Sequence, residues 1–136
     1  MIDSLTDLNI AYSTIEPSQL EHIIGPRYSM LSKAKYVYFA RGSSDLYKIY
    51  TKNRNNFARI TAANSRPKAH IDSEIQFLEY CDKNGVPVSK PVSDREEKMT
   101  LSLKYPEGDR YLNLFEEVSG THVASPNSWQ LKSIGH

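Results

Sequence analysis

The sequence has a single cysteine, Cys81, among its 136 residues. One thiol excludes an internal disulfide and a cysteine-based metal site, so we expect a protein of the reducing cytoplasm. The four histidines are scattered without the spacing of metal ligands, which gives no reason to expect a metal centre. Long hydrophobic runs are also absent, because acidic residues interrupt the first thirty positions. We therefore expect neither a signal peptide nor a membrane span, and no membrane partner.

A surplus of charge of one sign is absent as well. Seventeen lysines and arginines stand against sixteen aspartates and glutamates, and the formal net charge is +1. This balance, without long blocks of like charge, argues against a dedicated nucleic-acid-binding protein. The length suits one domain with its own hydrophobic core but is short for a complete enzyme of two lobes.

The first half of the chain predicts a short helix followed by three strands. Pro17 and the apolar residues after it are typical of an amphipathic helix, which Gly25-Pro26 would end. Runs of β-branched and aromatic residues predict strands at 36–39, 45–50 and 56–60. Because the links between these strands are short, neighbouring strands should be antiparallel.

The clearest element is a longer helix in the middle of the chain. Ser65 is its expected N-cap, Pro67 lies in its first turn, and Asn84-Gly85 would end it. The apolar residues at helical spacing are Ile71, Ile75, Leu78 and Cys81.

The second half of the sheet is predicted after this helix. Prolines extend the segment 86–92, and alternating apolar residues at 99–105 and a further run at 111–118 predict two more strands. A last helix would begin at Ser125-Pro126. The expected fold class is therefore α+β, with a five-stranded antiparallel sheet, one main helix and a short amino-terminal helix.

Glu74 lies on the face of the main helix that should meet the sheet. A carboxylate directed at a core needs a cation, and Arg59, on the preceding strand and on the same face as Phe57, is the nearest candidate. The alternative is that Glu74 lies at the edge of the apolar stripe and Arg59 points to water. Spacing alone leaves both arrangements open.

A glycine lies between the first two predicted strands, in the segment Gly42-Ser43-Ser44. Glycine permits a close approach, so backbone N–H groups and hydroxyls there could contact a phosphate. A plain hairpin turn explains a single glycine equally well.

Taken in order, these segments resemble the aminoglycoside phosphotransferase and type II homoserine kinase family from about residue 17 to residue 136. The segments that carry the resemblance are RGSSDLYKI at 41–49, FARI at 57–60, Glu74, NGVPVSKPV at 84–92, PEGDRY at 106–111 and LFEEVSG at 114–120. The resemblance implies the amino-terminal lobe of a protein-kinase-like fold, with ATP as the bound nucleotide.

The resemblance also implies a role for each residue of the nucleotide site. The loop at 42–45 would cover the phosphates, Arg59 would contact them with Glu74 as its helix partner, and Phe57 would cover the adenine. The main chain of Glu116 to Val118 would hydrogen-bond the adenine edge. The residues so assigned are Gly42, Ser43, Ser44, Asp45, Phe57, Arg59, Glu74, Glu116, Glu117 and Val118.

Two positions depart from the kinase pattern. The loop lacks the G-x-G-x-x-G arrangement of protein kinases, and Arg59 stands where the strand lysine is expected.

The catalytic residues of the family have no counterpart in this sequence. Its carboxyl-terminal lobe would supply an aspartate base, an asparagine and a second aspartate for magnesium, yet no aspartate follows Asp109. We therefore expect an amino-terminal lobe at 35–120, preceded by a helical extension at 1–34 and followed at 121–136 by the start of the next lobe, broken off. Such a chain would be inactive alone and would need its second lobe in cis or in trans, with Mg²⁺ bound only when that lobe is present.

Two alternatives come from other functional classes. The chain could be a stand-alone regulatory subunit that docks on a catalytic partner or self-associates through Trp129, Leu131 and Ile134 in the last predicted helix. It could also be an α+β domain that stacks RNA bases on strand aromatics, although its neutral charge weighs against this.

Overall fold

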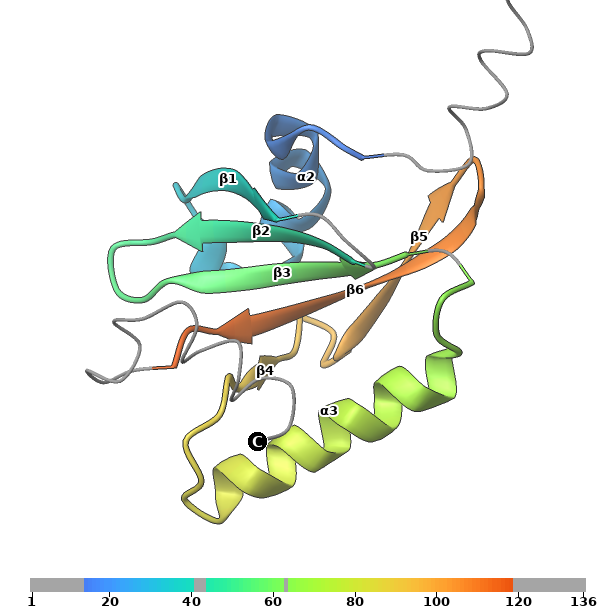
Figure 1. Ribbon diagram of the computed structural model, residues 1–136. Coiled ribbons are helices and arrows are strands. Elements are labelled where there is room, and N and C mark those ends of the chain that lie inside the picture. The colour runs from blue at the N-terminus through green and yellow to red at the C-terminus, as the bar shows by residue number, and fades with distance from the viewer. Residues whose placement is uncertain (1–13, 41–43, 63, 119–136) are drawn as a thin grey trace, which may run out of the picture.

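The computed structural model describes residues 14–40, 44–62 and 64–118. The elements are helix α2 (Pro17–Ile24), two 3₁₀ turns (Gly25–Arg27 and Ser29–Leu31), strands β1 (Lys35–Ala40), β2 (Ser44–Tyr50) and β3 (Asn56–Thr61), helix α3 (Lys68–Lys83), and strands β4 (Pro91–Val92), β5 (Thr100–Tyr105) and β6 (Gly108–Glu116). Figure 1 shows the sheet in the middle of the molecule, with α2 on one side and α3 on the other. The predicted α+β class is confirmed.

The strands form one antiparallel sheet in the order β1-β2-β3-β6, and β4 and β5 share the far edge of β6. Strand β5 pairs with the first part of β6, whereas β4 pairs with Leu114 and Phe115 farther along. The sheet therefore has six strands and not the predicted five. The additional strand, β4, lies in the segment 86–92, which the sequence predicts only to be extended. Pro91 lacks an N–H, and an edge position is where a sheet tolerates such a residue.

The main core lies between the sheet and α2. Pro17 is the first residue of this helix, and Leu20 and Ile24 are fully buried. Tyr28 and Leu31, which follow the helix, are buried in the same cluster. The strand residues of the cluster include Tyr47, Ile49, Ala58, Ile60, Leu112 and Leu114. The segment before β1, expected as an extension, is thus packed into the core of the lobe.

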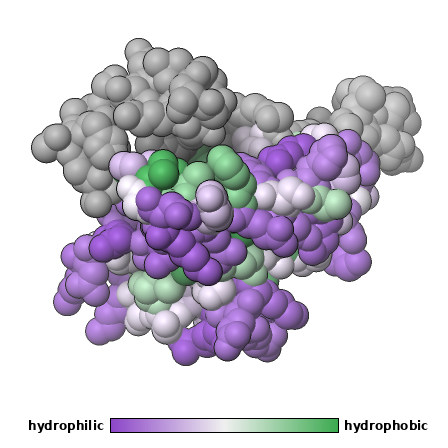
Figure 2. Space-filling model, turned by 90° about the horizontal axis from the view of Figure 1, so that it is seen from below, coloured by the Kyte–Doolittle hydropathy of each residue, from purple (hydrophilic) through white to green (hydrophobic). Residues whose placement is uncertain are grey.

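Helix α3 covers the opposite face of the sheet with a smaller cluster, in which Ile71 and Ile75 are buried with Phe115 of β6. Its outward side is largely hydrophilic, and Figure 2 shows this face with smaller hydrophobic areas among polar residues. The helix ends at Lys83, and Gly85 takes the positive φ of 79° that suits a glycine after a helix. In the described part of the chain, no helix is long and apolar enough to cross a membrane.

The start of α3 differs from the prediction. The helix begins at Lys68 with Pro67 in the N-cap position, whereas the Ser65 hydroxyl donates to the carbonyl of Ala62, 2.8 Å away. Ser65 is therefore a turn residue and not the N-cap. The reason is the proline, because the residue before a proline is disfavoured in the helical region, which keeps Arg66 out of the helix.

A fully buried ion pair joins β2 to β6 on the α2 side of the sheet. Arg110 and Asp45 are both inaccessible to solvent, and Arg110 Nη2 lies 3.3 Å from Asp45 Oδ2. The same guanidinium donates to the carbonyl oxygens of Ile60 and Thr61, each 3.0 Å away, at the end of β3. One side chain thus connects three strands of the sheet.

Arg110→Ala should lower the free energy of unfolding by about 3–5 kcal/mol, because it leaves the buried Asp45 carboxylate without its cation. Urea denaturation followed by circular dichroism measures the change. Lys104→Ala is the control, because the Lys104 side chain is 85% exposed beside Asp109 and such a pair contributes little. Equal effects of the two substitutions would contradict the assigned role of Arg110.

Candidate functional site

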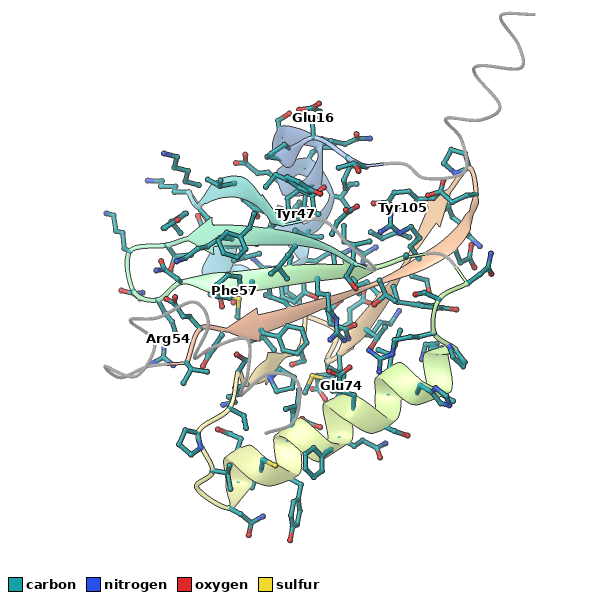
Figure 3. All side chains as sticks on the ribbon, viewed as in Figure 1. Glu16, Tyr47, Arg54, Phe57, Glu74 and Tyr105 are labelled. Carbon is teal, nitrogen blue, oxygen red and sulfur yellow. The ribbon has the colours of Figure 1, made fainter. Side chains whose placement is uncertain are left out.

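Arg59 of β3 and Glu74 of α3 form a bidentate ion pair between the sheet and the helix. Arg59 Nη1 donates to Glu74 Oε2 at 3.0 Å, and Arg59 Nη2 donates to Glu74 Oε1 at 2.9 Å. The strand alternation makes this possible, since Ala58 and Ile60 face the main core and Arg59 must face α3. Figure 3 shows Glu74 extending from α3 toward the sheet. The predicted ion pair is confirmed, and the solvent-directed alternative is excluded.

A second arginine, which sequence reasoning missed, completes this group. Arg66 Nη1 donates to Glu74 Oε1 at 2.9 Å, the same oxygen that accepts from Arg59 Nη2. Arg66 lies in the link between β3 and α3, so no helix or strand spacing relates it to Glu74. Only the path of the link brings the two side chains together.

The two arginines determine the charge state of Glu74. Burial alone would raise the pKa of this carboxyl group, but hydrogen bonds and charge from Arg59 and Arg66 outweigh it and lower the pKa below its ordinary value of 4.5. The three side chains together carry a net charge of +1 at neutral pH.

One edge of the Arg59 guanidinium is unpaired among the described residues. Its Nε is buried and has no hydrogen-bond partner among the described residues. Both terminal nitrogens bind Glu74 with one N–H each, so the Nε–H and the outer N–H of Nη2 form a second fork. A buried N–H group without a partner is unfavourable, which makes this edge suited to the oxygens of an anion.

Lys48 and Phe57 lie on the same side of the sheet as Arg59, beside the part that α3 covers. Lys48 Nζ is 5.6 Å from the centroid of the Phe57 ring and 3.4 Å from Glu117 Oε2. Phe57 is 7% exposed and packs edge-to-face on Phe39, with ring centroids 5.9 Å apart. An aromatic ring and a cation therefore lie between Arg59 and the end of β6.

The chain after β6 is held by the turn between β2 and β3. The amides of Glu116 and Glu117 donate to the carbonyls of Lys90 and Asn55 at 2.8 and 2.9 Å. Glu116 Oε1 also lies 2.8 Å from Nη1 of Arg54, which Figure 3 labels at this end of the sheet. The amides of Glu116 and Glu117 thus already donate hydrogen bonds within the chain. This leaves the Val118 amide as the candidate donor to the adenine edge.

Of the predicted phosphate loop at 42–45, the structure describes Ser44 and Asp45, which belong to β2. Ser44, the first residue of β2, pairs with Thr61 on the side of the sheet that carries Arg59. The Asp45 side chain differs from expectation, because strand alternation turns it to the other side, into the ion pair with Arg110. Gly42 and Ser43 lie outside the described residues, as do Trp129, Leu131 and Ile134.

The described residues do not fit a magnesium ion. Magnesium prefers carboxylate and water oxygens in octahedral geometry. Both oxygens of Glu74, the carboxylate beside Arg59, instead accept hydrogen bonds from guanidinium groups. The described part of the chain holds no group of three or more acidic, histidine or cysteine side chains that could bind a metal.

No known family profile matches the chain. Among curated proteins, an uncharacterized protein of Synechocystis is 29% identical over 109 residues, which cover 80% of this chain and 30% of that protein. An uncharacterized protein of Deinococcus radiodurans is 25% identical over 109 residues, which cover 80% of this chain and 32% of that protein. The chain therefore spans about a third of the length of these relatives.

Among solved structures, an amicoumacin kinase in complex with AMP-PNP superposes with a TM-score of 0.68 at 17% identity, covering 91% of this chain and 36% of that one. A microcompartment-associated aminopropanol kinase gives a TM-score of 0.64 at 16% identity, covering 82% and 34%. A spectinomycin phosphotransferase in complex with ADP gives 0.57 at 15% identity, covering 85% and 33%. The chain has the fold of the amino-terminal lobe of kinase-like phosphotransferases.

Glu74→Gln should destabilise the chain at pH 7 but not in acid. A carboxyl group whose pKa is lowered by folding contributes stability above its unfolded pKa, and this contribution is lost as the pH falls through the folded pKa. Urea denaturation at pH 7 should therefore show a difference from the unsubstituted chain that shrinks as the pH falls below 4.5. Asp72→Asn, on the same helix beside the exposed Lys68, should have a small effect at both pH values. A difference for Glu74→Gln that does not depend on pH would contradict this role.

Proposed function

We propose that the chain is the nucleotide-binding lobe of an ATP-dependent phosphotransferase that acts on a small molecule with a hydroxyl group. The observation that carries the proposal is the unpaired guanidinium edge of Arg59, held in place by Glu74. The kinase-like fold supports it, because the amicoumacin kinase and spectinomycin phosphotransferase structures contain AMP-PNP and ADP. We place the protein in the cytoplasm, in keeping with its single cysteine.

Arg59 is the phosphate-binding residue of this proposal. A lysine would place one compact charge between its glutamate and the phosphates, whereas a guanidinium offers two separate edges. Glu74 occupies one edge, and phosphate oxygens would accept hydrogen bonds from Nε and Nη2 on the other. Charge-assisted hydrogen bonds of this kind are strong and directional. The departure from the strand lysine is therefore compatible with phosphate binding.

The adenine would lie toward the end of β6. Phe57 would cover one side of the base, and the Val118 amide would donate to its edge. Lys48 lies beside the Phe57 ring and the Glu117 carboxylate, so it can contact a polar group at the border between base and sugar. Ser43 and Ser44 would contact the phosphates from the loop, with Gly42 allowing the close approach.

Phosphate transfer would use residues of a second lobe. The acceptor oxygen attacks the γ-phosphorus, the bond from the γ-phosphorus to the bridging oxygen breaks, and ADP leaves. The hydroxyl proton would pass to an aspartate of that lobe, which would also supply the magnesium ligands. We expect the 136-residue chain to bind nucleotide weakly and to transfer no phosphate without that lobe, in cis or in trans.

Arg59→Ala should weaken ATP binding by roughly ten- to hundredfold, since hydrogen bonds to charged groups contribute about 1.5–3 kcal/mol. Isothermal titration calorimetry with the full chain measures the dissociation constant. Lys104→Ala, which removes the same charge from the β5–β6 hairpin, should leave the constant unchanged. Equal ATP affinity of Arg59→Ala and the unsubstituted chain would show that the phosphate contact is assigned wrongly.

A further inference from the structure

The two guanidinium groups that share Glu74 lie close to each other. Arg59 Nη2 and Arg66 Nη1 each lie 2.9 Å from the same oxygen, Glu74 Oε1. Two donors on one acceptor cannot be farther apart than about 6 Å, twice a hydrogen-bond length. Neighbouring phosphate groups of one polyphosphate chain can therefore contact both arginines at once.

The backbone on either side of Arg66 is fixed. The amide and hydroxyl of Ser65 both donate to the Ala62 carbonyl, at 3.2 and 2.8 Å, which closes a turn just before Arg66. Pro67 follows directly and restricts φ. The side chain therefore starts from a defined position, although its tip is 37% exposed.

Arg66 keeps donors available for a ligand. Its Nη1 uses one N–H on Glu74, and its Nη2 reaches the carbonyl of His70 at 3.5 Å, the outer limit of a hydrogen bond. A guanidinium has five N–H donors, so these two contacts leave three of them for a ligand.

The charges also favour an anion at this place. Glu74 alone would neutralise Arg59, and Arg66 restores a net positive charge beside the unpaired edge of Arg59. A second cation on an already paired carboxylate adds little stability when it is partly exposed. Stability therefore does not explain why Arg66 is there, whereas binding of a ligand with several negative charges does.

We propose that Arg66 is a second phosphate-binding residue, which makes the site prefer nucleotides with longer phosphate chains. This inference rests on the nucleotide-binding function proposed above. In it, Arg59 contacts the phosphate nearer the nucleoside, and Arg66, at the solvent side, contacts the next one. A role limited to bracing Glu74 would instead act through Arg59, so Arg66→Ala would weaken ADP and ATP binding by the same factor.

The test compares affinities for adenosine, ADP and ATP by isothermal titration calorimetry, using the full chain and three variants. Arg66→Ala should weaken ATP binding about tenfold and leave adenosine binding unchanged, with ADP in between. Arg66→Lys should restore part of the preference for ATP, because it keeps the charge but loses the fork. Lys104→Ala, which removes a distant positive charge, should leave all three affinities unchanged.

The outcomes separate this inference from the proposed function. If Arg59→Ala loses ATP binding but Arg66→Ala keeps the unsubstituted ratio of ATP to ADP affinity, the inference is overturned and the proposed function stands. If the unsubstituted chain binds none of the three ligands, the proposed function fails and the inference fails with it. Thermal unfolding checks that each variant is folded, and Arg66→Gln takes the place of Arg66→Ala if that variant does not fold.

Discussion

The ion pair between Arg59 and Glu74 is the interaction on which the geometry of the site depends. Among the described residues, a small cluster built on Ile71, Ile75 and Phe115 packs α3 on the sheet. The ion pair adds a directional contact to this non-directional one, and it is sheltered, with Arg59 17% and Glu74 29% exposed. Removing Glu74 would leave the Arg59 guanidinium unpaired in a partly dry place, whereas removing Arg59 would leave Glu74 with Arg66 alone. Helix position and guanidinium orientation are therefore set by the same two hydrogen bonds.

A second ion pair lies on the other side of the sheet. The two pairs differ in burial, and we infer different functions for them from this difference. Arg110 and Asp45 are inaccessible, and the guanidinium also binds two carbonyls of β3, so no ligand reaches them. Arg59 is partly open and keeps a buried Nε without a described partner. The inaccessible pair connects the strands, and the accessible one offers a donor edge. Strand alternation alone assigns Asp45 to the first and Arg59 to the second.

Sequence reasoning reached the elements and one contact of the site. Helix α3 and five of the strands follow from periodicity, and the pairing of Arg59 with Glu74 follows from the cost of burying a carboxylate. Strand β4 has two residues, too few for any alternation, and Arg66 meets Glu74 through a link whose path no spacing rule gives. The nucleotide roles of all the assigned residues remain predictions, and Gly42 and Ser43 also lie outside the described part of the chain.

An arginine at the strand position changes how such a lobe can bind phosphate. A lysine ammonium can turn its three donors toward glutamate and phosphate together, whereas a guanidinium is planar and must present separate edges to the two partners. Because Glu74 takes the edge of both terminal nitrogens, a phosphate bound as proposed would approach from the Nε side. Arg66 then offsets the charge that Glu74 removes, so the local field stays positive even with the ion pair intact. Under the proposed function, the lobe contributes a fixed arrangement of positive charge, and the bond-breaking chemistry falls to groups outside it.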